Sequence, residues 1–329
     1  MTPWVDAFGR HARKLRVSVT DRCNLRCVYC MPENPVWLPK DEVLSFEELT
    51  RIVKISACNG VDRVRVTGGE PLLRKDLPVF IGMLKKISGL REVALTTNGL
   101  LLPMQARALR EAGLDRVTVS VDSLDRKRVR ALSRRDSHDA TLAGILAARD
   151  AGFEGDALKV NVVVMRGRNE DEVGDIAAWA RDEGLNLRFI EFMPLEGDRI
   201  WSRSLLVPAD EIVARVAKRF PIAPGVRIPG ETAESFAFED GKGSFGVIAS
   251  VTKAFCSDCD RIRLTADGGF RTCLFATAST DLRESLRQGA SDDEIAERMK
   301  MSISRKDKGH LVDSPEFQRP ERAMNAIGG

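Results

Sequence analysis

Three cysteines stand close together near the N-terminus, at Cys23, Cys27 and Cys30, with the spacing C-x3-C-x2-C. A loop this short can wrap three thiolates around one inorganic centre, whereas disulfides between such close neighbours would be strained. No histidine adjoins the loop to supply a fourth ligand, since the nearest is His11. Three thiolates on a 4Fe–4S cube leave one iron open, which is typical of a catalytic metal. A zinc site and an incidental cysteine group are the alternatives.

A second cysteine triplet lies toward the C-terminus, at Cys256, Cys259 and Cys273, with the spacing C-x2-C-x13-C. The sequence predicts a hairpin over 261–272 that turns at 267–269 and returns the third cysteine to the first two. A structural zinc site normally needs four ligands, and here again there are three. The residues alone leave zinc and iron–sulfur open. An iron–sulfur cluster with an open iron would suggest direct ligation of a substrate atom.

Small and polar residues follow several predicted strands. Gly68-Gly69-Glu70-Pro71 comes after the second strand, and the residues at the ends of later strands are Thr96, Thr97, Asn98, Ser120, Asp122 and Met193. Active sites of barrel-like α/β folds lie at the carboxyl ends of the strands, so we expect these residues to converge. A Gly-Gly pair alone indicates only a tight turn. After a strand it also lets a ligand approach the backbone closely.

Cationic side chains lie on the predicted strands, at Arg16, Arg65, Lys159, Arg188, Arg261 and Arg263. Arg261 and Arg263 are two residues apart, so they point to the same face of a strand beside the second cysteine group. Arginine suits phosphate because its planar donor fork binds two oxygens. Unpaired cations are costly inside an α/β fold. Cations that face inward would therefore form an anion pocket, whereas each could alternatively face solvent.

The elements that position these residues alternate between strand and helix. Six strand–helix units are predicted before residue 220, with strands over 15–20, 63–67, 93–97, 116–121, 158–164 and 187–193. Such alternation favours a parallel sheet, and six units fall short of the eight that close a barrel. We predict an incomplete (βα)6 TIM-type barrel over residues 1–220. Residues 221–329 are predicted to bind the second cluster, with a linker over 221–230 and a polar, mobile segment from about 302.

The composition of the 329 residues is that of an ordinary globular protein, with 43% apolar and 30% charged residues. A net charge of +3 gives no indication of a nucleic-acid binder. No run of about 18 apolar residues could span a membrane, and residues 1–16 lack an apolar signal segment. We therefore expect a cytoplasmic protein with no nucleic-acid or membrane partner. Of the seven cysteines, only Cys58 stands outside the two triplets, and it is predicted to be a buried thiol.

Four segments together resemble the GTP 3′,8-cyclase family, the radical S-adenosylmethionine (SAM) enzymes that open molybdenum cofactor biosynthesis. They are Lys14–Pro32, Arg65–Pro71, Cys256–Phe275 and the final Ile327–Gly329. The resemblance covers essentially the whole chain. It implies an incomplete TIM-type barrel with a C-terminal cluster-binding layer, and commonly a homodimer. One departure is Asp260, which stands where the family usually has asparagine and could weaken the local positive field.

The resemblance implies a role for each matching residue. One 4Fe–4S cluster would bind SAM and would be held by Cys23, Cys27 and Cys30. A second 4Fe–4S cluster would bind substrate and would be held by Cys256, Cys259 and Cys273. The implied SAM contacts are Tyr29, Gly69, Ser120 and Met193, and the implied GTP contacts are Arg16, Arg65, Thr96, Lys159, Arg188, Arg261 and Arg263. Gly328 and Gly329 would reach the active site.

The resemblance also implies a reaction and its partners. One electron cleaves SAM to a 5′-deoxyadenosyl radical, which takes hydrogen from C3′ of GTP, and the C3′ radical then attacks C8 of guanine. The product is (8S)-3′,8-cyclo-7,8-dihydroguanosine 5′-triphosphate. The implied partners are a reductant such as flavodoxin and the downstream cyclic pyranopterin monophosphate synthase.

Two other functions remain open on the sequence. A different radical SAM enzyme with an auxiliary cluster, such as a peptide modifier, would share the barrel and both cysteine triplets. It would need neither the triphosphate-binding cations nor the Gly-Gly end. A non-enzymatic iron–sulfur sensor or zinc-stabilised binding module would show no Gly-Gly-Glu segment after the second strand.

Overall fold

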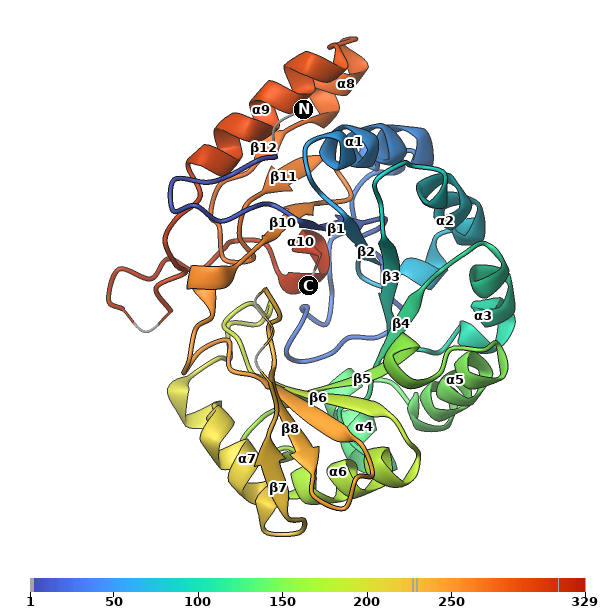
Figure 1. The fold of residues 1–329 in the computed structure, drawn as a ribbon, viewed down its shortest axis with the longest axis vertical. Coiled ribbons are helices and arrows are strands. Elements are labelled where there is room, and N and C mark those ends of the chain that lie inside the picture. The colour runs from blue at the N-terminus through green and yellow to red at the C-terminus, as the bar shows by residue number, and fades with distance from the viewer. Residues whose placement is uncertain (1–2, 227, 229, 313, 329) are drawn as a thin grey trace.

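The computed structural model describes residues 3–226, 228, 230–312 and 314–328, and its centre is one curved sheet of twelve strands (Figure 1). The strand order is β12-β11-β10-β1-β2-β3-β4-β5-β6-β9-β8-β7. The strands are β1 (Lys14–Ser18), β2 (Arg63–Thr67), β3 (Glu92–Thr97), β4 (Arg116–Ser120), β5 (Leu158–Val164), β6 (Asn186–Glu191), β7 (Ile222–Pro224), β8 (Glu234–Phe238), β9 (Ser244–Ile248), β10 (Arg261–Leu264), β11 (Gly269–Arg271) and β12 (Thr280–Asp281).

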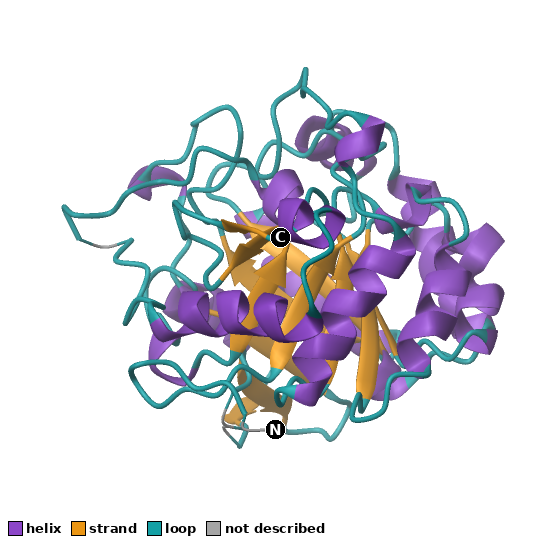
Figure 2. Ribbon diagram, turned by 90° about the horizontal axis from the view of Figure 1, so that it is seen from above, coloured by secondary structure: helices purple, strands orange, loops and turns teal. Residues whose placement is uncertain are grey.

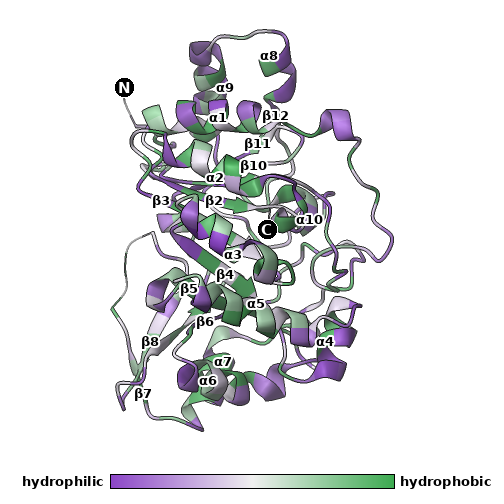
Figure 3. Cartoon of the chain, turned by 90° about the vertical axis from the view of Figure 1, so that its right-hand side faces the viewer, coloured by the Kyte–Doolittle hydropathy of each residue, from purple (hydrophilic) through white to green (hydrophobic). Residues whose placement is uncertain are grey.

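Helices cover the outside of this sheet, and Figure 2 shows the strands enclosed by helices and loops. The α-helices are α1 (Phe46–Cys58), α2 (Leu77–Lys85), α3 (Leu102–Glu111), α4 (Arg126–Ser133), α5 (His138–Asp150), α6 (Val173–Asp182), α7 (Ala209–Ala217), α8 (Arg283–Arg287), α9 (Asp292–Ser304) and α10 (Met324–Ile327). Figure 3 shows purple polar and green apolar residues on the same outer helices, as expected for helices with one buried face. None of the described helices is both long and apolar enough to cross a membrane.

Local sequence explains where these elements begin and which face they bury. A capping box starts α1, because the Ser45 hydroxyl accepts from the Glu48 N–H and the Glu48 carboxylate accepts from the Ser45 N–H. In β1, Leu15 and Val17 are fully buried, whereas the alternating Lys14 and Arg16 are only half-buried. The inner and outer faces of the strand therefore differ as the period of two predicts.

The sheet confirms the predicted partial barrel and extends it at both edges. The first six strands pair in parallel in chain order, as the strand–helix rhythm predicts. Two later strands join the same parallel set, since β10 pairs with β1 and β9 pairs with β6. Across the described residues β12 and β7 lie at opposite ends of the strand order, so the curved sheet stays open. The domain boundary near residue 220 stays a prediction.

Two local predictions are wrong. The proline-rich stretch after residue 220 is not only a linker, because β7 pairs with β8 there, and Pro224 is tolerated because β7 is an edge strand. Cys58 is exposed rather than buried, because it is the last residue of α1 and falls beyond the helix's apolar face. Between β4 and Gly152 the chain forms two helices, α4 and α5, which are separated where Arg134 adopts a left-handed conformation with φ of 55°.

Candidate active site

The first cysteine loop lies over the carboxyl end of the barrel. It follows β1 directly and is held by backbone hydrogen bonds to the end of α4, from Arg26 N to Ser133 O (2.9 Å) and from Val28 N to Leu132 O (2.9 Å). The Arg26 guanidinium also packs over the Trp37 ring, at 5.0 Å from its centroid. These contacts hold the backbone of the first cysteine loop in place.

The two glycines after β2 pack against the backbone that enters this loop. Gly69 N donates to Thr20 O (2.8 Å), and Glu70 N donates to Arg22 O (2.8 Å). A Cβ placed on Gly69 would lie 2.4 Å from the carbonyl oxygens of both Asp21 and Arg22. Gly69 is therefore required for close backbone packing, beyond any ligand contact.

Glu70, which follows β2, is hydrogen-bonded to the end of β3. Its buried carboxylate accepts hydrogen bonds from Thr97 Oγ1 (2.7 Å), Asn98 N (2.8 Å) and Leu72 N (3.0 Å). Burial raises the pKa of Glu70 to about 7 against the opposing effect of these donors. The chain of contacts continues to the cysteine loop, because Asn98 Nδ2 donates to Asn24 Oδ1 (2.7 Å).

We expect Glu70→Gln to lower the free energy of unfolding of the metal-free protein by about 1–3 kcal/mol, the cost of a buried polar group left unsatisfied. The glutamine NH2 group must face a donor, either the Asn98 N–H or the pair formed by Thr97 and Leu72. Urea denaturation measures the loss. Glu111→Gln is the control, because Glu111 is exposed on α3. Equal free energies of unfolding for Glu70→Gln and Glu111→Gln would show that the glutamine at position 70 leaves no buried polar group unsatisfied.

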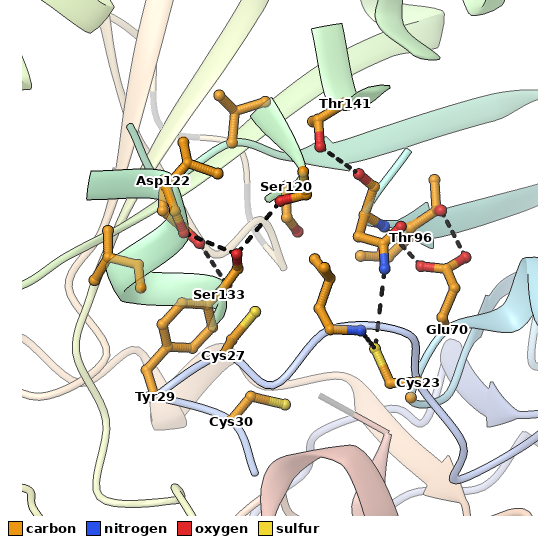
Figure 4. Close-up of a pocket in the computed structure, with 18 of the residues that line it drawn as sticks. Cys23, Cys27, Tyr29, Cys30, Glu70, Thr96, Ser120, Asp122, Ser133 and Thr141 are labelled. Atoms are coloured by element: carbon orange, nitrogen blue, oxygen red, sulfur yellow. Dashed lines mark hydrogen bonds between the residues drawn. The ribbon is translucent and has the colours of Figure 1, made fainter. Parts of the chain in front are cut away.

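The three cysteines share one cavity of about 140 Å³ with the strand-end residues (Figure 4). Its lining includes the predicted Tyr29, Gly69, Thr96 and Ser120, and also Asp122. The Tyr29 hydroxyl donates to Asp122 Oδ2 (2.6 Å), which joins the cysteine loop to the end of β4. Met193 is not part of this lining and packs instead in an apolar cluster with Leu195, Trp201, Met324 and Ile327.

The donor set of this cavity fits an iron–sulfur cluster. All three thiols are free. Burial raises the pKa of Cys23 to about 11 and the pKa of Cys27 well above its usual value, so the thiolates need a cationic core to form. Leu25 N already donates to Cys23 Sγ (3.3 Å). In the described part of the chain no three His, Cys, Asp or Glu side chains converge on a single metal ion.

The second triplet lines a separate cavity of about 420 Å³, where Cys256, Cys259 and Cys273 meet the segment 306–311. The predicted hairpin forms, with β10 paired antiparallel to β11. Burial opposes ionisation of Cys259, but the positive charges of Arg261 and Lys306 outweigh it and lower the pKa of that thiol to about 6. The Phe275 N–H donates to Cys273 Sγ (3.4 Å). These donors also suit a thiolate-bound cluster.

Strand register brings the predicted cations into one row. Arg16 on β1 stands between Arg263 on β10 and Arg65 on β2. Directly opposed residues in a sheet point to the same face, so these three guanidinium groups lie side by side. Arg65 is held in place by Thr96 Oγ1 and Thr118 Oγ1, both 3.1 Å from its Nη1.

The row carries excess positive charge. Burial lowers the pKa of Arg16 well below its usual value, and the neighbouring Arg263 and Arg65 lower it further. Burial lowers the pKa of Arg263 to about 9, again with arginine neighbours contributing. Burial and then Arg188 lower the pKa of Lys159 to about 8. Among the described residues, neither Arg16, Arg65 nor Arg263 forms an ion pair with a carboxylate, so no carboxylate balances the positive charge of the row.

The end of the chain enters this row. Residues of α10 fix it to the first cysteine loop, because Met324 N donates to Cys30 O (3.2 Å) and Asn325 Nδ2 donates to Asp21 O (3.2 Å). The Arg263 guanidinium then donates to the carbonyl of Gly328. Figure 1 shows α10 at the centre of the ring of strands. Gly329 lies outside the described residues.

Several residues around the site were missed by sequence reasoning. Lys14 and Arg63 sit two positions before Arg16 and Arg65, and alternation alone could have placed them on the same face. Glu231, which pairs with Lys14 (3.5 Å), Arg63 (3.6 Å) and Arg188 (3.5 Å), gave no signal in the sequence. The polar segment after 302 was expected to be mobile, yet it has defined contacts, since Arg322 pairs with Asp267 (2.6 Å).

Known proteins resemble this chain over nearly its full length. Residues 17–180 match the family described as Radical SAM superfamily, and residues 185–312 match Molybdenum Cofactor Synthesis C. A protein of Streptomyces coelicolor named GTP 3′,8-cyclase is 47% identical over 99% of this chain and 96% of its own length. One of the same name from Rhodopirellula baltica is 44% identical over 99% and 92%. The crystal structure of Streptococcus suis SuiB bound to precursor peptide SuiA has a TM-score of 0.64 at 13% identity, covering 95% of this chain and 76% of that one, which shows a shared fold.

Proposed function

Because the chain belongs to the GTP 3′,8-cyclase family of the radical SAM superfamily, we infer that it catalyses the first step of molybdenum cofactor biosynthesis. It converts GTP to (8S)-3′,8-cyclo-7,8-dihydroguanosine 5′-triphosphate, with two 4Fe–4S clusters and SAM as cofactors. When bound, the first cluster supplies the electron that cleaves SAM, and the second supplies an iron site for the guanine.

The observation that carries this function within the barrel is the row of Arg16, Arg65 and Arg263. A triphosphate brings the negative charge that this row lacks, and guanidinium forks bind phosphate oxygens in pairs. A peptide substrate would give no reason for so many unbalanced cations. The arginine row therefore favours a nucleotide over the peptide-modifying alternative.

We assign the remaining roles as part of the same proposal. Cys23, Cys27 and Cys30 hold the SAM cluster, and Tyr29, Gly69, Ser120 and Met193 contact SAM. Cys256, Cys259 and Cys273 hold the substrate cluster. The GTP contacts are Arg16, Arg65, Thr96, Lys159, Arg188, Arg261 and Arg263, and Gly328 and Gly329 complete the site. Rigid strands position these groups, so the chain contributes orientation and charge while the cofactors contribute the radical chemistry.

The partners extend this proposal. A cytoplasmic reductant such as flavodoxin delivers the electron, and the cyclic pyranopterin monophosphate synthase receives the product. The enzyme acts as a homodimer. Size-exclusion chromatography with light scattering tests the dimer, and a mass equal to that of one chain contradicts it.

An anaerobic assay with GTP, SAM and a reductant tests the function. The expected result is an isomer of GTP with the mass of the cyclised product, formed together with 5′-deoxyadenosine. Iron and sulfide analysis should give about eight iron atoms per chain. SAM cleavage that never consumes GTP, in protein with both clusters loaded, would contradict the proposed substrate.

We expect Arg261→Ala and Arg263→Ala to weaken GTP binding by about 1.5–3 kcal/mol each, the value of a hydrogen bond to a charged group. The loss should be smaller for guanosine, which has no phosphates. Equilibrium dialysis of the cluster-loaded protein measures both ligands. Arg107→Ala is the matched control, because that side chain is 90% exposed on α3. Equal losses for GTP and guanosine would show that the two arginines do not bind phosphate.

A further inference from the structure

Lys306 is a buried cation beside the second cysteine triplet. Only 6% of the residue is exposed, although it follows the last turn of α9 on a polar stretch of chain. Its ammonium donates to Cys259 O (2.9 Å) and to Arg261 O (3.0 Å), and lies 3.6 Å from Cys259 Sγ. Lys306 therefore binds the backbone carbonyl groups on both sides of Asp260.

Burial of this ammonium needs a compensating negative charge. Among the residues that the structure describes, Lys306 forms no ion pair with a carboxylate, and two carbonyl oxygens supply only dipoles. A buried, unpaired ammonium costs several kcal/mol. The anionic group in its immediate surroundings is the thiolate of Cys259, together with whatever that thiolate ligates.

Arg10 holds the segment that carries Lys306 against the cysteine loop. Its guanidinium donates to Cys256 O (2.7 Å), Lys308 O (3.0 Å) and Asp307 O (2.7 Å). Asp6 fixes its orientation through an ion pair of 2.6 Å. The N-terminal arm thus joins two segments that lie far apart in sequence, 256–261 and 306–308, at the point where Lys306 enters the loop.

We propose that Lys306 is a positioning residue of the second cluster, which holds the Cys259–Arg261 backbone and provides the buried positive charge that offsets the thiolate-bound iron–sulfur core. The proposal rests on the proposed function in one respect, that the second triplet holds a 4Fe–4S cluster. Net charge and hydrogen bonds to cluster sulfurs set the reduction potential of such clusters. Lys306 therefore favours the reduced, more negative state and fixes the backbone of Arg261, whose guanidinium donates to Cys259 Sγ (3.4 Å).

The test uses the full chain with Cys23, Cys27 and Cys30 all changed to alanine, so that only the second cluster remains. In this background Lys306→Met and Lys306→Arg are compared by iron content and by electron paramagnetic resonance at fixed potentials. Lys308→Met is the matched control, because Lys308 is exposed two residues away and uses only its carbonyl in the contact with Arg10.

We expect Lys306→Met either to lose the second cluster's iron or to keep it with at least about a tenfold lower ratio of reduced to oxidised cluster, as removal of a nearby charge predicts. Lys306→Arg and Lys308→Met should match the reference protein. If Lys306→Met keeps both the iron content and the ratio of reduced to oxidised cluster, the inference about Lys306 is wrong and the proposed function stands. The same holds if Lys306→Arg, which keeps the positive charge, loses as much iron or reduced cluster as Lys306→Met. A reference protein that never assembles the second cluster overturns the proposed function with it.

Discussion

Cys27→Ala is expected to abolish reductive cleavage of SAM, whereas Cys259→Ala is expected to retain uncoupled cleavage and to lose conversion of GTP. The structure places the two cysteines in separate cavities, with Cys27 beside Tyr29 and Gly69 and Cys259 beside the segment 306–311. Loss of one thiolate ligand removes its own cluster without touching the other pocket. The first variant therefore loses radical generation, and the second loses the substrate site.

Both products are measured in one anaerobic reaction, with 5′-deoxyadenosine reporting SAM cleavage and the cyclised nucleotide reporting GTP conversion. Cys58→Ala is the control, since Cys58 is exposed at the end of α1 and lies in neither triplet. About half the iron of the reference protein should remain in each site variant, because one of two clusters persists. An equal loss of SAM cleavage in Cys27→Ala and Cys259→Ala would refute the division of labour.

The barrel could be predicted from sequence because its signals are local. Each of the first six strands is a short apolar run followed by a helix, and a parallel sheet is the arrangement that such alternation produces. The site followed from the same rule, since strand ends meet at one edge. The sequence therefore predicts that Cys23, Gly69, Thr96 and Ser120 converge at one edge of the sheet, and the structure places them in one cavity.

The remaining features depend on pairing between distant segments, which local patterns do not encode. Nothing near β10 indicates that it pairs with β1, yet this pairing aligns Arg263 with Arg16. The sequence also gives no sign that Lys306 is buried, because a lysine among polar residues usually faces solvent. Its burial depends on contacts with Arg10 and Cys259, which are remote in sequence.

Gly328 lies where a side chain does not fit. Its φ is 72°, in the left-handed region that favours glycine, and a Cβ there would stand 2.5 Å from Ser18 Oγ and 3.3 Å from Thr67 Cγ2. The Gly328 carbonyl accepts from Arg263 within the arginine row. A displaced Gly328 therefore moves a guanidinium that we assign to the substrate.

We expect Gly328→Val, and equally deletion of Gly328 and Gly329, to lower GTP conversion by at least about 100-fold, since a misplacement of about 1 Å at a reacting site can cost that much. Uncoupled SAM cleavage and iron content should persist, because the contacts of Met324 and Asn325 with the first cysteine loop lie upstream of the change. Product formation and 5′-deoxyadenosine release, measured together, separate the two effects.

Two further variants decide whether the steric conflict is the cause. Gly328→Ala should be impaired, and adding Ser18→Gly should restore part of the activity, because it removes the hydroxyl that the new methyl group meets. Gly289→Ala is the matched control for backbone strain alone, since Gly289 has a φ of 83° but nothing within 4 Å of an added Cβ. Full turnover by the protein truncated after Ile327 would show that the Gly-Gly end takes no part in the reaction. If Gly328→Ala is impaired and the added Ser18→Gly change restores no activity, the defect comes from backbone strain and not from the contact with Ser18 on β1.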